Sequence, residues 1–181
     1  VAVAPLAPAN CGFDVAGRAG NGWSDFFGQR FAGQPFKSVA ITVREAGDDS
    51  RVLFQRAGEF VATAAGVEGS LIYAASSLLR DQIAACGQAT LWLDLLPART
   101  PAQVLAALRA PRGGQSLANQ LRRQLKLDGI KTALLNELLA RESLQNAEQL
   151  ARAIKALPIH LTATRPVAEA ISSAGGVRWG E

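Results

Sequence analysis

Two glycines stand directly before a helical pattern and enclose two residues, one of which is acidic. They are Gly66 and Gly69, with Val67 and Glu68 between them and Ser70 after them. Glycine lets a backbone approach a ligand closely, and the free N–H groups at a helix start attract an anion or the electron-rich edge of a ring. The stretch is not GxGxxG, and it lacks the lysine of a phosphate-binding loop. Taken alone, these residues favour a tight strand-to-helix turn over a cofactor contact.

A second glycine pair stands near the C-terminus. Gly175 and Gly176 lie between Ala174 and Val177. Adjacent glycines let a backbone pass close to a cofactor or to another strand. A plain turn explains the pair equally well, so both interpretations stay open.

The third candidate is a set of cations in the second half of the chain: Arg109, Arg112, Arg122, Arg123, Lys126 and Lys131. Phosphate binding would need them on one face, beside aromatic or groove-fitting side chains. Their segment has no aromatic residue, and Arg122 and Arg123 point about 100° apart on a helix. The net charge of +4 is small for a nucleic-acid footprint unless it is clustered. We therefore predict a solvated polar face and no nucleic-acid partner.

No combination of residues forms a recognisable catalytic or metal site. Asp48 and Asp49 are adjacent within turn chemistry, which favours solvated turn formers. His160 is the only histidine and stands in an alternating apolar run, where a structural role is expected. Cys11 and Cys86 lie far outside CxxC spacing, so we expect neither a disulfide framework nor zinc, and a cytoplasmic location. We name no catalytic residue and no metal ligand.

Length and composition suit a folded chain. At 181 residues there is room for one domain or two small ones with a buried core. No apolar run approaches the ~20 residues that cross a bilayer, so no membrane association is expected. Methionine is absent throughout, which we interpret as a sign of a processed or excised piece of a longer protein.

The first glycine pair is positioned by one helix and by several strands. Apolar residues at helical spacing predict a helix over 69–86, with Gly87 at its C-terminal end. Period-two alternation predicts the strands. In chain order these are 38–45, 51–56, 59–63 after a break at Gly58, 90–96 and 159–164.

Helical patterns dominate after Pro97. Thr100 caps the first expected helix, and the second spans 116–127. Asp128 is expected to cap the third, and Asn146 the fourth, which ends before Pro158. These patterns predict a small helical subdomain of about four helices.

The two ends of the chain have less regular patterns. Residues 1–37 are rich in glycine and proline, so we expect an irregular segment laid across a neighbouring surface, with a short helix over 25–30 capped by Ser24. The tail over 166–176 is ambiguous between helix and strand.

Together these elements predict an α+β fold, in which a mixed or barrel-like β-sheet portion carries an inserted all-helical subdomain. The N-terminal segment covers 1–37. The β-rich portion covers 38–97 and 159–181 and contains the one long helix over 69–86. The helical subdomain covers 98–158.

Short motifs spread over nearly the whole chain resemble one family. They are PANCGF at 8–13, WS at 23–24, RFAGQPFK at 30–37, GEFVAT at 58–63, GVEGSLIY at 66–73, LDLLP at 93–97, TRP at 164–166, AIS at 170–172 and SAGGV at 173–177. This combination resembles the bacterial FAD-binding flavoproteins of the aminoacetone-oxidase-like, NAD(P)/FAD-dependent oxidoreductase family.

The resemblance implies a role within a larger flavoprotein. In that family a dinucleotide-binding half precedes an insert with barrel-like and helical portions, and a returning segment completes the FAD site. The chain resembles the insert and the beginning of the return. The resemblance thus implies FAD in the full-length parent and none bound to this fragment, which would be inactive alone. The implied partners are the FAD-binding domain of the same parent chain and an unknown small-molecule substrate.

The resemblance also gives the glycine pairs a possible role. It implies that Gly66, Glu68, Gly69 and Ser70 face flavin or substrate in the parent, with Gly175 and Gly176 near the same junction. Two other classes stay open. Leucine-rich helices suit an interaction or oligomerisation module without a redox role, and the arginines suit a nucleic-acid binder, which ranks last.

Overall fold

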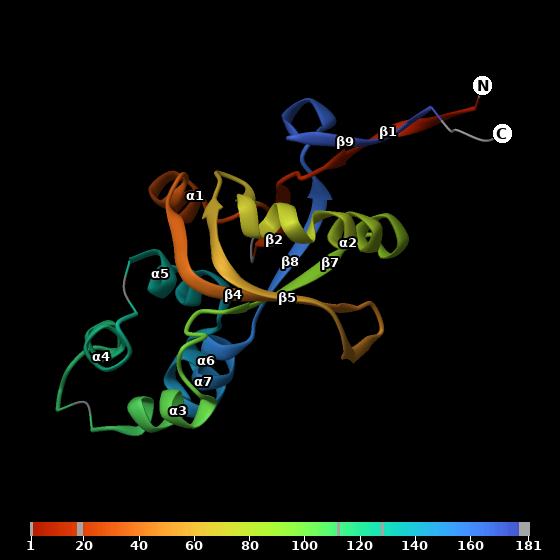
Figure 1. The fold of residues 1–181 in the computed structure, drawn as a ribbon. Helices are drawn as coiled ribbons and strands as arrows, with labels where there is room; N and C mark the ends of the chain where they lie inside the picture. The colour runs from red at the N-terminus through yellow and green to blue at the C-terminus, as the bar shows by residue number, and fades with distance from the viewer. Residues whose placement is uncertain (1, 18–19, 112, 128, 178–181) are drawn as a thin grey trace.

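The computed structural model describes residues 2–17, 20–111, 113–127 and 129–177. Within them, seven strands form one ring-like sheet in which every pairing is antiparallel (Figure 1). The strand order is β3-β2-β6-β5-β4-β7-β8, and β2 also pairs with β8. The strands are β2 (Phe13–Gly17), β3 (Gly20–Asn21), β4 (Pro35–Glu45), β5 (Asp48–Ala62), β6 (Gly66–Glu68), β7 (Ala89–Asp94) and β8 (Leu157–Thr164).

Alternating side chains from these strands fill the interior of the sheet. Val39, Ile41 and Val43 of β4 are fully buried, because successive side chains of a strand point to opposite faces. Phe36 and Phe60 stack inside with ring centroids 4.6 Å apart. The period-two pattern of the sequence therefore identifies the inner face correctly.

The long helix α2 (Ser70–Cys86) packs against β5, β7 and β8. Its buried face carries Leu71, Ile72, Ala75 and Leu79, which recur at helical spacing. The helix ends at Gly87, whose N–H donates to the Ile83 carbonyl at 2.8 Å. The sequence prediction for this helix and its end is confirmed.

A two-stranded antiparallel ribbon extends away from the ring-like sheet. It consists of β1 (Val3–Ala9) and β9 (Ser172–Val177). Figure 1 shows that β1 and β9 lie side by side and extend together away from the sheet.

The helical part lies between β7 and β8 in the chain and on the opposite side of the sheet from the ribbon (Figure 1). Thr100 and Gln103 form a capping box at its first helix, and Asn146 caps its last one, as expected. The helices are α3 (Pro101–Arg109), α4 (Leu117–Gln120) followed by a π-helical turn (Leu121–Leu125), α5 (Gly129–Leu138), α6 (Arg141–Gln145) and α7 (Ala147–Lys155).

The expectation of an irregular N-terminal segment over 1–37 is wrong. It contains β1, β2, β3 and helix α1 (Asp25–Phe31), of which only the Ser24-capped helix was expected. Strands β1 and β2 pair with segments more than 50 residues away in the chain. Pairing with such distant segments produces no periodic pattern in the local sequence.

Three other expectations need correction. Strand β5 continues through Gly58 instead of breaking there, because the residue pairs with Val39 of β4. The helical part adds α6, and the second expected helix divides into α4 and a π-helical turn. The proposed cap Asp128 lies outside the described residues. The ambiguous tail forms a 3₁₀ turn (Val167–Glu169) and then β9.

The division of the chain into domains stays a prediction, but the α+β fold class is confirmed. The sheet is ring-like without being a clear barrel, and the helical part is inserted between two of its paired strands. Within the described ranges, no helix is long and apolar enough to cross a bilayer.

Candidate functional site

The first glycine of the predicted site, Gly66, is fixed by contacts within the sheet. It opens β6 and pairs with Asp14 of β2. A Cβ atom at this position would lie 1.8 Å from the Phe13 carbonyl oxygen, so only glycine allows the two strands to come this close. The Gly66 carbonyl also accepts a buried hydrogen bond from Trp23 Nε1 at 3.1 Å. This residue therefore positions the junction and faces the protein interior.

The residues from Glu68 to Ser70 form a partly exposed start to α2. Gly69 is the N-cap, with φ +108°, a value that favours glycine, and no side chain caps the helix. Glu68 and Ser70 are exposed on either side of it. The first-turn N–H groups of a long helix are thus presented beside one carboxylate and one hydroxyl, which suits an electron-rich group on a ligand.

The base of the β1–β9 ribbon is attached to the middle of α2. Asn10 N donates to Ser76 Oγ at 3.0 Å, and Arg80 Nη1 donates to the Pro8 carbonyl at 3.0 Å. Asn10 Nδ2 also reaches Ser172 Oγ at 2.9 Å, which ties the two ribbon strands together. These hydrogen bonds fix the direction in which the ribbon extends from α2 and the ring-like sheet.

Arg165 provides the second attachment at this base. Its guanidinium bonds Asp14 at 3.0 Å and both carboxylate oxygens of Glu169, at 2.8 and 2.9 Å. These hydrogen bonds hold the pKa of Glu169 below its usual value and raise that of Arg165. Arg165 N also donates to the Gly12 carbonyl at 2.9 Å. The sequence analysis missed this cluster, although Arg165 and Glu169 have the i, i+4 spacing of an ion pair.

The second glycine pair lies on the ribbon, apart from the helix start. Gly176 pairs with Ala4 of β1. A Cβ atom on Gly175 would come within 2.2 Å of the Pro5 carbonyl oxygen, so close approach of β1 explains this glycine. The strand interpretation is therefore correct and the plain turn is wrong. The structure brings Glu68 close to the ribbon base at Gly12. Gly175 and Gly176 belong instead to β9, which pairs with β1 in the ribbon that extends away from the ring-like sheet (Figure 1).

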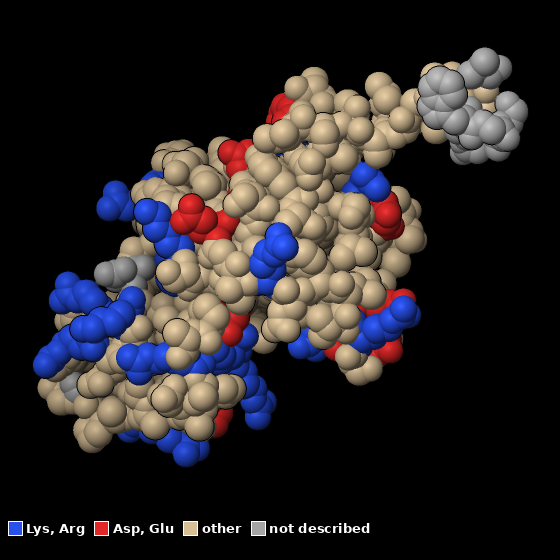
Figure 2. Space-filling view, in the orientation of Figure 1, with Lys and Arg blue, Asp and Glu red and all other residues tan. Residues whose placement is uncertain are grey.

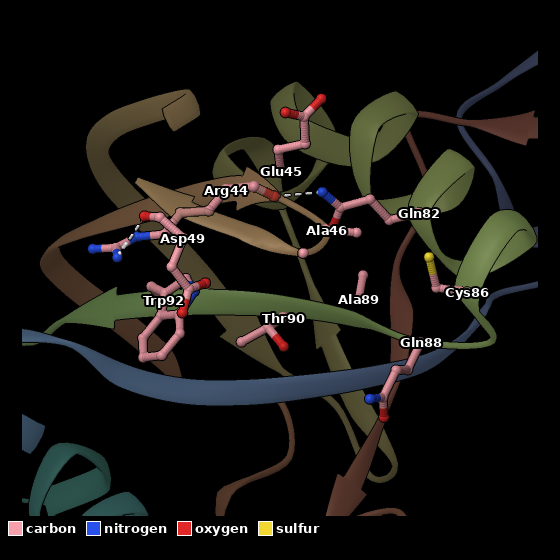
Figure 3. Close-up of a pocket in the computed structure, with 11 residues that line it drawn as sticks. Arg44, Glu45, Ala46, Asp49, Gln82, Cys86, Gln88, Ala89, Thr90 and Trp92 are labelled. Atoms are coloured by element: carbon pink, nitrogen blue, oxygen red, sulfur yellow. Dashed lines mark hydrogen bonds between the residues drawn. The ribbon is translucent and has the colours of Figure 1, made fainter. Parts of the chain in front are cut away.

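A polar hollow of about 450 Å³ opens where the tip of the β4–β5 hairpin separates from β7 (Figure 3). The Arg44 guanidinium lies over the Trp92 ring, 5.2 Å from its centroid, and Nη1 donates to the Asp49 carbonyl at 2.9 Å. Gln82 Nε2 of α2 donates to the Arg44 carbonyl. These groups bond to one another, so their main role is to hold the hairpin against α2 and β7.

The residues considered for catalysis lie in separate elements. Cys11 is buried before β2, and burial raises the pKa of its thiol, whereas Cys86 is exposed at the end of α2. His160 on β8 has Nδ1 3.1 Å from Thr90 Oγ1 of β7. Across the residues that the structure describes, no group of three or more His, Cys, Asp or Glu side chains could hold a metal ion.

Comparison with known families identifies the chain. The family model of the HI0933-like protein barrel and H2TH domain matches residues 7–172, which is most of the sequence. The chain belongs to this family. Its members are FAD-dependent oxidoreductases, and the matched region is one domain of them. A search of curated proteins finds no match.

The exposed groups of this HI0933-like domain partly fit FAD. The uncapped start of α2, with Gly69 and Ser70, offers backbone N–H groups of the kind that bind the polar edge of a flavin or a phosphate. The sequence contains no GxGxxG stretch to cradle the pyrophosphate. In full-length members of the family the cofactor is FAD.

Proposed function

We propose that this chain is the insert domain of an FAD-dependent oxidoreductase and docks on the FAD-binding domain of the same parent protein. In this proposal the insert shapes the substrate side of the flavin and is inactive alone. The motif resemblance supports an aminoacetone-oxidase-like parent that acts on a small molecule in the cytoplasm.

The observation that carries the proposal is the apolar surface of the ribbon. Side chains of β1 and β9 and of the adjoining turn are exposed although they are large and apolar. The exposed fractions are 68% for Val3, 61% for Leu6, 38% for Val167, 71% for Ile171 and 52% for Val177. An isolated two-stranded ribbon is marginally stable in water, and apolar patches of this kind mark interaction surfaces. We infer that the FAD-binding domain covers this ribbon.

The arrangement of the ribbon also suits an insert. Its two strands hold both ends of the described chain side by side, as a domain inserted into another domain requires (Figure 1). The ribbon base contacts α2 through Asn10 and Arg80. A partner seated on the ribbon would therefore come close to the helix that carries Gly69 and Ser70.

Within this proposal the six predicted site residues have different roles. Glu68 and Ser70 are exposed and Gly69 between them is half-buried, and these three residues would face the flavin or the substrate. Gly66 and Gly175 allow close strand approach, so they would act by positioning the helix and the ribbon. Gly176 has open space around the position of a Cβ atom and would lie within the docking surface.

The test compares the full-length parent with two variants. In Ile171→Asp a charge is placed in the turn that adjoins β9 of the ribbon, and in Val52→Asp the same charge is placed on the exposed hairpin, where Val52 is 50% exposed. We expect Ile171→Asp to lower the bound FAD and the turnover and to speed amide exchange in β1 and β9, while Val52→Asp leaves all three unchanged. Equal behaviour of the two variants would contradict docking through the ribbon. Stoichiometric FAD binding and turnover by the isolated 181-residue chain would contradict its proposed inactivity.

An oligomerisation module without a redox role is the second candidate. An apolar groove of about 410 Å³ between α3 and α7, lined in part by Ala102, Leu105 and Ala151, favours it. Light scattering of Leu105→Glu, with Gln103→Glu as the control, tests this candidate. If a dimer forms through the groove, only the first change will produce monomers.

A further inference from the structure

The charges of the chain are divided unequally between its parts. Residues 98–158 contain ten Lys and Arg against four Asp and Glu, whereas the rest of the chain contains nine against eleven. Figure 2 shows Lys and Arg side chains gathered over the helical part, at the lower left of the view. The modest net charge of +4 therefore hides a basic face on one side of the molecule.

The fold brings aromatic side chains to this basic face. A crevice of about 330 Å³ opens between α1, α4 and α5, and Phe26 and Phe31 of α1 line it opposite Arg122. Phe26 is 66% exposed, an unusual position for a phenylalanine, and its ring lies edge-on to Phe31 at 6.3 Å. The expectation of no nucleic-acid partner relied in part on the lack of aromatics between residues 98 and 158. Packing of α1 against α5 supplies them.

Polar groups line the same crevice. Thr132 Oγ1 is buried and has no hydrogen-bond partner in the described structure. Asn136 Nδ2 donates to the Thr132 carbonyl at 2.8 Å, and the Asn119 side chain lines the opposite wall. Hydroxyl and amide groups can bond the edge of a planar ring, and a buried hydroxyl without a partner calls for an explanation.

The cations beside the crevice are available for an anion. Arg122 and Arg123 are exposed, and neither forms an ion pair with another described residue. Arg30 lies over the Phe31 ring at 6.0 Å and adds a third positive charge. Glu137, the carboxylate of α5, is bonded to Ser24.

We propose that this crevice binds a nucleotide unit, with its base stacked on Phe26 and its phosphate at Arg122. A base provides the flat π face that an exposed phenylalanine stacks against, and its edge suits Asn119, Asn136 and Thr132. The adjacent arginines suit a phosphate. The unit comes from a single-stranded nucleic acid or from a free nucleotide, since a paired base inside a duplex cannot stack on a side chain. This inference is independent of the proposed redox role.

The test uses the 181-residue chain and a fluorescently labelled oligothymidylate, with anisotropy as the readout. Phe26→Ala should weaken binding about tenfold through lost stacking and leave the salt dependence unchanged. Arg122→Gln should weaken binding and reduce the slope of log K against log salt by about 0.7. Val52→Ala and Arg51→Gln are the matched controls on the distant hairpin, and neither should change binding. Circular dichroism verifies that each variant is folded.

Competition experiments identify the source of the nucleotide unit and test whether binding depends on charge alone. Uridine monophosphate that binds as tightly as the oligomer, and loses this binding in Phe26→Ala, would support a free nucleotide. Binding of the oligomer alone would support a nucleic-acid strand. If inorganic polyphosphate competes as well as the oligomer and Phe26→Ala has no effect, the surface attracts charge only and the proposal is overturned. Absence of oligomer and nucleotide binding overturns it as well.

Discussion

Glu137 of α5 accepts two hydrogen bonds from Ser24, the N-cap of α1, although the two residues lie 113 positions apart. Ser24 N donates to Oε1 at 2.6 Å and Ser24 Oγ donates to Oε2 at 2.7 Å. Ser24 Oγ also accepts from Phe27 N at 3.2 Å and so caps α1 itself. One carboxylate therefore connects the helical part to the N-terminal segment and completes a helix cap.

Glu137→Gln should destabilise the protein by about 1–2 kcal/mol. The amide of glutamine keeps one acceptor but loses the charge and the second acceptor, because its nitrogen can only donate. Urea unfolding measures the loss, and amide exchange in α1 should become faster. Glu142→Gln is the control at an exposed position of α6 and should change the unfolding free energy by less than about 0.5 kcal/mol. Equal losses in the two variants would show that the pair contributes nothing.

The Arg165 cluster should make the ribbon base sensitive to acid. Hydrogen bonds from Arg165 lower the pKa of Glu169 in the folded protein from its ordinary value of 4.5. A carboxyl whose pKa is lower in the folded than in the unfolded state contributes stability above the unfolded pKa, and this contribution is lost as the pH falls through the folded pKa. We therefore expect amide exchange in β1 and β9 to rise below pH 4.5, the ordinary value for this carboxyl.

An NMR titration of the Glu169 carboxyl carbon checks this prediction. In Arg165→Gln the pKa of Glu169 should return towards its ordinary value, and β1 and β9 should exchange faster even at neutral pH. Arg51→Gln removes an equivalent exposed ion pair, with Glu45 on the hairpin, and should leave the ribbon unaffected. A Glu169 carboxyl that already titrates at its ordinary value in the unchanged protein would refute the role of Arg165.

Elements with a local pattern could be predicted from the sequence. Helix α2 repeats apolar residues at helical spacing from Leu71 to Ile83, and β4 alternates buried and less buried side chains from Val39 to Val43. The expected cap Ser24 also has a purely local cause, since its hydroxyl accepts from Phe27 N. In each case the residues that determine the structure lie within a few positions of one another.

Elements that depend on distant partners could not be predicted. Strands β1 and β9 lack alternating polar and apolar residues. Neither strand has one face turned to a buried core and the other to solvent, so apolar side chains are exposed on the ribbon. Gly66 was correctly predicted to lie at a junction. The reason that glycine is needed there is the nearby carbonyl of Phe13 on another strand, which is visible only in three dimensions. The crevice beside Phe26 likewise requires α1 to pack on α5.

The two cysteines should differ strongly in reactivity. Cys86 is exposed, whereas Cys11 is buried and its pKa is raised by that burial, so Cys11 remains a protonated thiol at neutral pH. Ellman's reagent should therefore label one thiol rapidly in the folded protein and both thiols in urea. Cys86→Ser should abolish the rapid phase, and Cys11→Ser should preserve it. A rapid phase that survives Cys86→Ser would show that Cys11 is accessible.

Gly66→Ala should be the most damaging single change at the junction before α2. The added Cβ would lie 1.8 Å from the Phe13 carbonyl oxygen, and backbone atoms cannot yield as a flexible side chain can. We expect a loss of about 3 kcal/mol or more in the unfolding free energy. The indole N–H of Trp23, which donates to the Gly66 carbonyl, should also exchange faster. Gly58→Ala is the matched control in β5, where the new methyl group would meet only the Leu71 side chain at 3.3 Å and should cost less than about 1 kcal/mol. If both alanine variants unfold at the same urea concentration, close packing of β6 on β2 is not the reason for glycine at this position.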